Sequence, residues 1–403
     1  MRRILFFLLF LACQQSLMAV DDSEAAARLS ALGFENVRVA DYGRGTVFAS
    51  FEATGYRGTY HGAAAGLREL ARLYPEAGKF RVFLLEDQLP RVALTASVAD
   101  GQWTVAGDYD LTDYETALRI KPQVNGSAAR FDLTVFPMFS WINHRFNQAF
   151  EYVVSIAPAL QTSLWPGNRI ILQPVIPVSY DVQSINSEAY VHVGVANIAQ
   201  DLTFGHGRFT TTLTGGFFLY DRLGFDLRVG WRATPCLTLS AEGSITGEAL
   251  VRDGHYDIGP LKKISALAKA DYYEPRTRLQ AQLTAGRFVF GDYGVRADIS
   301  RHFGDYTIGL YGIYTGGEDN VGFHFAIPFG PKHYARKGAF RVKLPDYYDL
   351  EYNQVSAYKF YDEQMGKYLE IRPDENRSAH YWQAVHVAQY TEKVLNNQLR
   401  IHQ

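Results

Sequence analysis

Serine and histidine are the side chains in this sequence that could carry out nucleophilic hydrolysis. A hydrolase of that kind needs a serine with a histidine base in reach and a third group that orients the base. His302 follows Ser300 by two residues, and His192, His206 and His324 lie in other segments. No nucleophile-elbow glycine pattern surrounds any of them. Because the chain has 11 histidines and many serines, such neighbours arise by chance, and we predict that the protein is not an enzyme.

Metal and cofactor chemistry also find little support. The two cysteines, Cys13 and Cys236, are far apart and have no companions that would make a metal motif. His380 and His386 are separated by a spacing that fits neither one helical face nor a metal motif. We therefore expect no metal and no cofactor. The formal net charge of -2 excludes the basic surface of a nucleic-acid-binding protein.

Charged residues at alternating positions form a second candidate set. If the apolar positions of the strands described below face lipid, the intervening polar positions face a lumen. Mixed charges there could plug a narrow barrel with ion pairs, or line a hydrophilic path for a sugar polymer, for which Tyr190 and His192 would suit. The predicted lumen-facing residues are Tyr190, His192, Arg222, Asp226, Arg228, Arg232, Glu242, Glu248, Arg278, Arg296 and Asp298.

The strands that would position these residues begin at about residue 130. Between residues 223 and 232 apolar and polar residues alternate strictly, with Phe225, Leu227 and Val229 opposite Asp226 and Arg228. The pattern returns at residues 237–246, 278–285 and 295–300, and at 190–195, where it puts Val191, Val193 and Val195 on the apolar face.

Strict alternation also fits a soluble sandwich, but three features favour a transmembrane barrel. The segments exceed the usual strand length of about five to six residues, aromatic residues gather near their ends, and the chain begins with an export signal. In lipid a closed barrel satisfies every backbone group. We predict an antiparallel transmembrane β-barrel of about 10–12 strands over residues 130–342, closing with Gly322–Phe329 and interrupted early by Pro158, Pro174 and Pro177. No later segment is long and apolar enough for a membrane helix.

The first residues have the three-part layout of a secretory signal peptide. Arg2 and Arg3 precede an apolar run from Ile4 to Ala12, and a polar, small-residue stretch ends at Ala19. The run is too short for a membrane helix, which needs roughly 20 residues. We predict a signal peptide over residues 1–19. Lipid attachment at Cys13 is the alternative, although the preceding residues fit that pattern poorly.

Residues 20–105 differ in pattern and indicate a small α/β domain. Helices are expected over residues 21–32 and around residues 63–74, where Ala63, Leu67 and Leu70 share one face. Strands are expected near Val37, over residues 47–51 and over residues 80–85. The domain would serve as a periplasmic docking or spacer unit, joined to the barrel by a linker over residues 106–129.

The tail, residues 343–403, is the least regular part. Residues 344–349 break the alternation, and Ser378–Gln398 has a helical pattern with Ser378 as a possible cap. This helix is expected either in the periplasm or inside the barrel as a plug.

Three short segments resemble the YjbH-type exopolysaccharide and capsule outer-membrane proteins. They are the nine residues Gly286–Gly294, then Ile299–Phe303 and Gly322–Phe329. The resemblance is to the C-terminal half of those proteins, an α/β domain followed by a barrel, and it implies a role beside machinery that secretes exopolysaccharide. Those proteins carry a second barrel-forming half, which we expect another protein to supply here. The resemblance implies no catalytic or binding residue.

These observations predict a non-enzymatic component of exopolysaccharide or capsule secretion in the Gram-negative outer membrane, with its α/β domain in the periplasm. Expected partners are outer-membrane lipid, the polymer and other export proteins. The alternative is a barrel that assembles or translocates outer-membrane proteins, with a client-binding domain in the periplasm. A passive structural barrel is a third class.

Overall fold

The computed structural model describes residues 21–142, 151–181, 189–354, 364–374 and 382–399, so the predicted signal peptide, Cys13, Ser378 and His380 lie outside the described residues. The described part is mainly β, with two sheets. The smaller sheet has five strands in chain order, and β2 and β3 pair in parallel while the other pairs are antiparallel. Its strands are β1 (Glu35–Asp41), β2 (Thr46–Glu52), β3 (Lys79–Glu86), β4 (Leu89–Ala99) and β5 (Gln102–Asp108).

Helices α2 (Asp22–Ala31) and α3 (Thr59–Leu73) correspond to the two expected helices of this domain. Ala63, Leu67 and Leu70 of α3 are fully buried against the sheet, as their helical spacing predicts. Gly66 allows close contact, because a Cβ atom there would lie 2.3 Å from the Phe51 ring.

The predicted linker is part of this domain. Its first residues complete β5, and the following segment with the π-helical turn η1 (Tyr114–Leu118) covers the sheet face opposite the helices. Leu111 and Leu118 are buried there against Phe83. The segment is therefore a packed layer.

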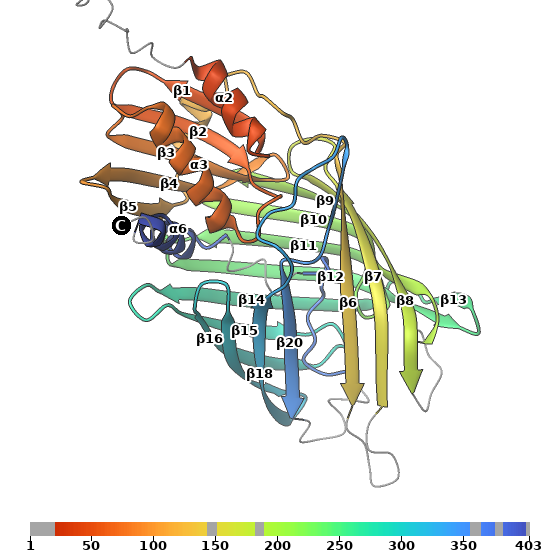
Figure 1. Cartoon of the computed structure of the whole chain (residues 1–403). Helices are drawn as coiled ribbons and strands as arrows, with labels where there is room; N and C mark the ends of the chain where they lie inside the picture. The colour runs from red at the N-terminus through yellow and green to blue at the C-terminus, as the bar shows by residue number, and fades with distance from the viewer. Residues whose placement is uncertain (1–20, 143–150, 182–188, 355–363, 375–381, 400–403) are drawn as a thin grey trace, which may run out of the picture.

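The larger sheet has 15 strands, more than the 10–12 predicted. It curls below the small domain (Figure 1). The strands are β6 (Phe131–Ile142), β7 (Glu151–Thr162), β8 (Asn168–Asp181), β9 (His192–Phe204), β10 (Phe209–Phe218), β11 (Arg222–Arg232), β12 (Leu237–Arg252), β13 (His255–Ile258), β14 (Lys263–Glu274), β15 (Leu279–Arg287), β16 (Tyr293–His302), β17 (Thr307–Thr315), β18 (Glu318–Pro328), β19 (Phe340–Lys343) and β20 (Tyr347–Gln354).

Among the residues that the structure describes, the ladder does not close. Gly322–Phe329 was predicted as the closing strand, but β20 follows β18 and pairs with it. Every pairing along the path from β6 to β20 is antiparallel and the number of steps is even, so these two end strands run in the same direction. Both line one cavity, yet among the described residues they form no ladder with each other. We call this gap between β6 and β20 the seam.

At the end next to the small domain, β19 bridges the seam. It pairs in parallel with the start of β6, from Phe340 opposite Phe131 to Lys343 opposite Thr134. Continued at the same offset, the ladder would meet Pro345 on one strand and Pro137 on the other. Proline has no N–H to donate to a ladder, so pairing stops and the chain crosses to β18.

The C-terminal helix α6 (Ala384–Leu399) lies where the tail was predicted to be helical. It packs beside α3 and against β5 (Figure 1). Ala384, Val387 and Leu395 are buried in the same core as α2 and α3. The last helix thus completes the first domain. No described helix is long and apolar enough to cross a membrane.

Candidate functional site

The small domain contacts the strand turns at one end of the large sheet. In the turn between β3 and β4, the backbone carbonyl of Asp87 accepts a 2.8 Å hydrogen bond from the N–H of Gly167, between β7 and β8. Leu111 donates its backbone N–H to His206, between β9 and β10, over 3.0 Å. Gln389 of α6 donates to the carbonyl of Pro275, between β14 and β15. The domain therefore covers this end of the sheet, which we call the domain end.

A continuous chain of ion pairs fixes the β3–β4 turn to the sheet. Arg372 pairs with Glu86 over 2.9 Å, and Glu86 also pairs with Arg91 over 3.3 Å. Arg91 in turn pairs with Asp201 of β9, which also lies 3.5 Å from Arg169. The last pair of the series joins Arg169 to Asp87 over 3.1 Å. We call these six residues the interface ion chain.

A second contact anchors α3. Asp305, in the turn between β16 and β17, accepts hydrogen bonds from Arg57 over 2.8 Å and from Tyr60. His61 lies 3.0 Å from the same carboxylate. Burial alone would raise the pKa of the Asp305 carboxyl group. The contacts with His61, Tyr60 and Arg57 stabilise its charged form more strongly, so the pKa of Asp305 falls below its usual range.

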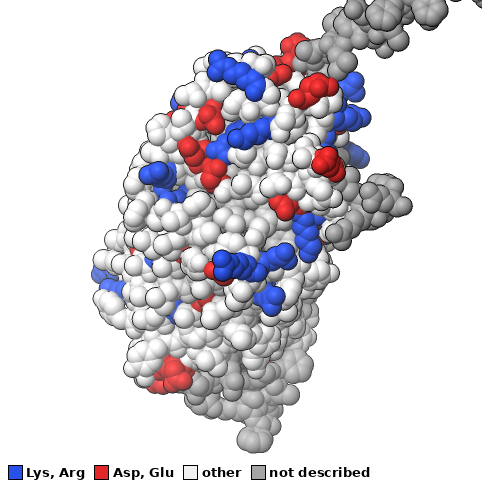
Figure 2. Space-filling model, turned by 90° about the vertical axis from the view of Figure 1, so that its left-hand side faces the viewer, with Lys and Arg blue, Asp and Glu red and all other residues white. Residues whose placement is uncertain are grey.

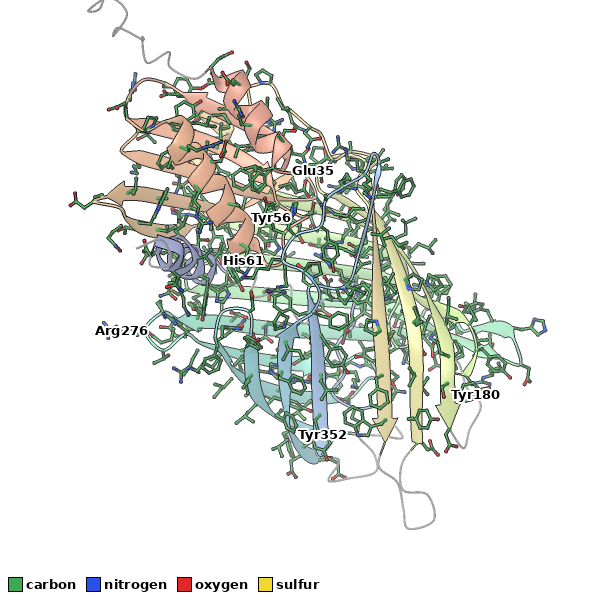
Figure 3. The ribbon with its side chains drawn as sticks, in the orientation of Figure 1. Glu35, Tyr56, His61, Tyr180, Arg276 and Tyr352 are labelled. Carbon is green, nitrogen blue, oxygen red and sulfur yellow. The ribbon has the colours of Figure 1, made fainter. Side chains whose placement is uncertain are left out.

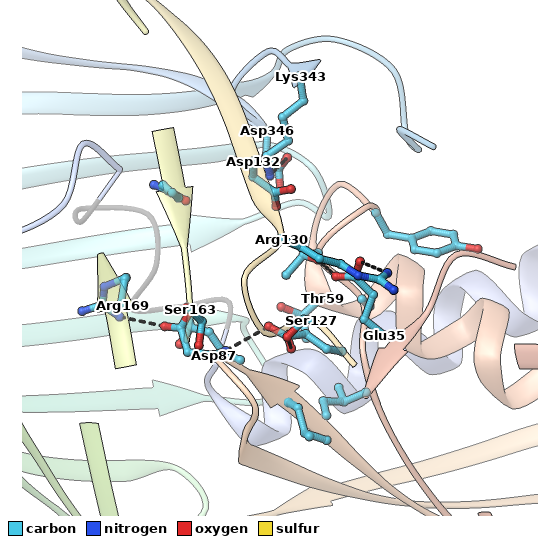
Figure 4. A pocket seen from close by; sticks show the side chains of 18 of the residues that line it. Glu35, Thr59, Asp87, Ser127, Arg130, Asp132, Ser163, Arg169, Lys343 and Asp346 are labelled. Atoms are coloured by element: carbon cyan, nitrogen blue, oxygen red, sulfur yellow. Dashed lines mark hydrogen bonds and ion pairs between the residues drawn. The ribbon is translucent and has the colours of Figure 1, made fainter. Parts of the chain in front are cut away.

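Between these contacts lies a cavity of about 180 Å³ lined by both domains. Figure 4 shows Asp87 and Arg169 on one side and Glu35 with Arg130 on the other. Glu35 accepts from Arg130 over 3.1 Å and from Arg336 over 2.5 Å. The charged groups of the wall are thus largely bound to one another, which makes the cavity a structural joint between domains.

Among the carboxyl groups of this joint, Glu52 has the pKa that is raised most. It is 3% exposed and accepts hydrogen bonds from Asn36, from Ser127 over 3.1 Å and from the backbone N–H of Asp87 over 2.9 Å. Burial, reinforced by the neighbouring Asp87 and Glu35, nevertheless raises the pKa of Glu52 to about 8. Burial likewise raises the pKa of Asp87 to about 6.

We expect the free energy of unfolding to fall as pH rises from about 4, the usual pKa of a carboxyl group in the unfolded chain, to about 8, the native pKa of Glu52. Both groups have native pKa values above those of the unfolded chain. The native state therefore binds more protons than the unfolded state, and that stabilisation is lost on deprotonation. Glu52→Gln should remove about 3–4 kcal/mol of this dependence between pH 5 and 8, measured by denaturant unfolding between pH 5 and 9. The exposed Glu76→Gln variant is the control, and an unchanged pH profile in Glu52→Gln would contradict the assignment.

The concave side of the large sheet brings together three of the predicted lumen-facing residues. Arg228 lies 2.9 Å from Asp226 and 3.6 Å from Glu242, and Lys269 adds a 3.0 Å pair to Glu242. Asp226 and Glu242 are buried. This is an ion-pair cluster inside the curled sheet.

Arg296 and Asp298 form a second interior cluster. Arg296 lies 2.9 Å from Asp298 and 2.9 Å from Glu351 of β20. Its guanidinium also stands 3.9 Å from the ring centroid of Tyr311, at cation–π distance. Glu351 was not predicted as an inward residue, because residues 344–349 break the alternation where β20 begins.

The tail passes through the interior between these clusters. Near the end of the sheet away from the small domain, Gly366 donates its N–H to Asp292 over 2.8 Å. Farther along, Arg228 donates to the carbonyl of Leu369 over 2.6 Å. Asn197 donates to the carbonyl of Ile371 over 2.9 Å. The next residue, Arg372, pairs with Glu86 and so belongs to the interface ion chain. The segment 364–374 therefore occupies part of the interior of the curled sheet, and we call it the plug.

Other predicted lumen residues lie elsewhere. Arg278 is exposed in the turn between β14 and β15, with its guanidinium 5.5 Å from the Tyr390 ring, and Arg232 at the end of β11 donates to the carbonyl of Arg91 over 3.0 Å. Both belong to the domain end. Arg222 is buried, but its partner Glu248 is half exposed.

The prediction at the start of β9 was partly wrong. A register shift opposite Gln173 and Pro174 follows Val193, so Val195 turns inward and is fully buried, whereas Val191 stays 63% exposed. Tyr190 precedes the strand and is only partly buried, and its carbonyl lies 2.9 Å from Nδ1 of His192. Neither Tyr190 nor His192 belongs to the two interior ion-pair clusters.

One serine and one histidine do meet. Ser300 Oγ lies 3.2 Å from His324 Nε2, while His302 contacts Thr307 and Gln280. Within the described residues no third group is hydrogen-bonded to the His324 ring, so the arrangement lacks the orienting member of a triad. Within the same residues no cluster of three potential metal ligands occurs.

The convex side of the large sheet is apolar. Phe225 is 57% exposed and Leu310 66% exposed, and Leu227, Leu283 and Ile299 are exposed in the same way. Figure 2 shows charged side chains mainly on the upper part of the molecule, with the lower part largely uncharged. In Figure 3, Glu35, Tyr56 and His61 mark the domain end, whereas Tyr180 and Tyr352 lie toward the opposite end of the sheet. The sheet thus has a charged interior and an apolar exterior.

No family model matches the sequence, and no curated protein matches it either.

Proposed function

We propose that the protein is a non-enzymatic outer-membrane component of exopolysaccharide or capsule secretion. In this proposal the large sheet is a transmembrane barrel and the small domain faces the periplasm. The observation that carries it is the inverted polarity of the sheet, because exposed leucine, isoleucine and phenylalanine over many strands suit lipid, while buried ion pairs suit an enclosed interior. The predicted export signal supports the outer-membrane location, and the resemblance to YjbH-type proteins supports exopolysaccharide or capsule as the polymer.

The plugged interior supports a scaffold in preference to a conduit. Ion pairs and the segment 364–374 occupy part of the space that a polymer would need. Of the two roles for the inward charges, the plug is therefore favoured, and polymer would cross the membrane through a partner. The small domain, held rigidly by the interface ion chain, would present a docking surface to export proteins.

We expect the purified protein to conduct little ion current across a planar lipid bilayer. Replacing both Leu369 and Ile371 by serine removes two buried apolar side chains of the plug, and losses of this kind cost about 2–5 kcal/mol each. The loosened plug should then give stepwise currents. Ile258→Ser in the exposed β13 strand is the control. Large, equal currents from all three proteins would contradict a plugged interior.

The function is tested in a deletion strain. Loss of secreted polymer, with normal levels of other outer-membrane proteins and restoration by the intact gene, is the expected result. Heat-modifiable migration of the membrane-fraction protein would test the barrel separately. Recovery of the processed protein as a freely soluble periplasmic species would contradict the proposal.

The open seam favours a second candidate function, assembly or translocation of outer-membrane proteins. Among the described residues β6 and β20 form no ladder with each other, so their facing edges offer a template on which another strand could form. Under this alternative, the deletion strain would lose other outer-membrane proteins while polymer export followed only indirectly.

A further inference from the structure

A cavity of about 190 Å³ lies at the seam. Phe136 and Met138 of β6 line one side, and Tyr347 and Tyr348 of β20 line the other. The volume is several times that of one water molecule, about 30 Å³, and most of the lining is apolar or aromatic. The cavity could accommodate a narrow apolar chain.

The cavity continues into the apolar exterior of the sheet. Met138 is 38% exposed and Phe139 is 47% exposed, although both belong to the strand that borders the cavity. Tyr347, on the inner side, is 3% exposed. A chain that entered between these residues would pass from the lipid-facing side toward the interior, and Asp349 is the charged residue that it would meet in the cavity wall.

One polar group in the wall has no partner. Gln173 of β8 is 2% exposed, and its Oε1 atom has no hydrogen bond among the described residues. Its Nε2 atom donates to the carbonyl of Ala157 over 3.4 Å. The unpaired acceptor is therefore Oε1, and a buried acceptor without a donor is costly.

We propose that the seam binds a hydroxylated acyl chain of a membrane lipid, an inference that rests on the proposed placement of the sheet in the outer membrane. The apolar lining takes the methylene groups, and the hydroxyl group donates to Gln173 Oε1. The bound chain occupies the position where β6 and β20 would otherwise meet. It thereby covers the two strand edges and holds the seam apart.

Photolabelling in lipid vesicles tests this inference. Two phosphatidylethanolamine probes carry a diazirine in one acyl chain, and only one of them also has a hydroxyl on that chain. Adducts are mapped by peptide mass spectrometry. We expect labelling of the inward residues Tyr347 and Leu219, roughly tenfold stronger with the hydroxylated probe because it pairs the buried acceptor. Leu310, on the convex side, should be labelled equally by both probes.

Three variants sharpen the test. Met138→Trp fills the entrance and should abolish labelling of Tyr347 and Leu219, whereas Leu310→Trp on the convex side should leave it intact. Gln173→Leu should keep the labelling but remove the preference for the hydroxyl group. Labelling confined to the convex side, or no preference in the unchanged protein, would overturn the inference. Absence of labelling even at Leu310 would instead refute the placement in the membrane.

Discussion

Arginine in place of Leu227 should destabilise the folded protein in a lipid bilayer by about 2–4 kcal/mol, the cost measured for arginine on the lipid face of barrels near the midplane. Leu227 lies in the middle of β11 and is 46% exposed. In water the same change at an exposed position would be nearly neutral. Folding titrations in lipid vesicles, followed by heat-modifiable migration, would measure the difference.

The control for this experiment is Gln102→Arg, at an exposed position of the small domain. It introduces the same side chain where water is expected, so it should change stability by less than about 0.5 kcal/mol. Equal, small effects of both variants would indicate that the convex side of the sheet is not in contact with lipid.

The second large effect is expected at the interface ion chain. Asp201 is 3% exposed, pairs with Arg91 and Arg169, and accepts a hydrogen bond from Thr212 over 2.7 Å. Asp201→Asn leaves two buried guanidinium groups without their shared carboxylate. Removing one partner of a buried pair costs about 3–5 kcal/mol. Denaturant unfolding should show this loss, together with faster proteolysis of the small domain.

A matched exposed pair provides the comparison. Arg252 and Asp257 are 3.6 Å apart with side chains 66% and 62% exposed. Because water screens such pairs, Asp257→Asn should cost no more than about 1 kcal/mol. If Asp201→Asn were equally mild, the chain of ion pairs would not hold the domain to the sheet. Combining Asp201→Asn with Arg91→Met should recover part of the loss, since one stranded charge is removed.

The local patterns predicted much of the fold. Alternation in β11 placed Asp226 and Arg228 opposite Leu227, and helical spacing placed Leu67 and Leu70 on one face. These predictions depend only on the periods of strand and helix. They failed where the period is interrupted, as at Val195, where a register shift reverses which side chains face inward.

Contacts between distant segments could not be predicted in this way. Asp87, Arg169 and Asp201 are far apart in the sequence, and each looks like an ordinary surface charge until the fold brings them together. Arg278 was assigned to the lumen by its place in the alternation, but it has a φ of 57° in a turn. The motif Gly286–Gly294 was noticed for its resemblance. Its Asp292 in fact binds the plug at Gly366.

The position of α6 affects the order in which the protein can mature. Strands β1 to β5 leave the ribosome early, yet their hydrophobic core includes Val387 and Leu395, which are made only after the strands of the large sheet. Until the whole chain has emerged, the first domain exposes an apolar face, and contacts this distant in sequence form slowly. The segment 364–374 lies inside the sheet and precedes α6, so a completed first domain would mean that the strands of the large sheet have already been made.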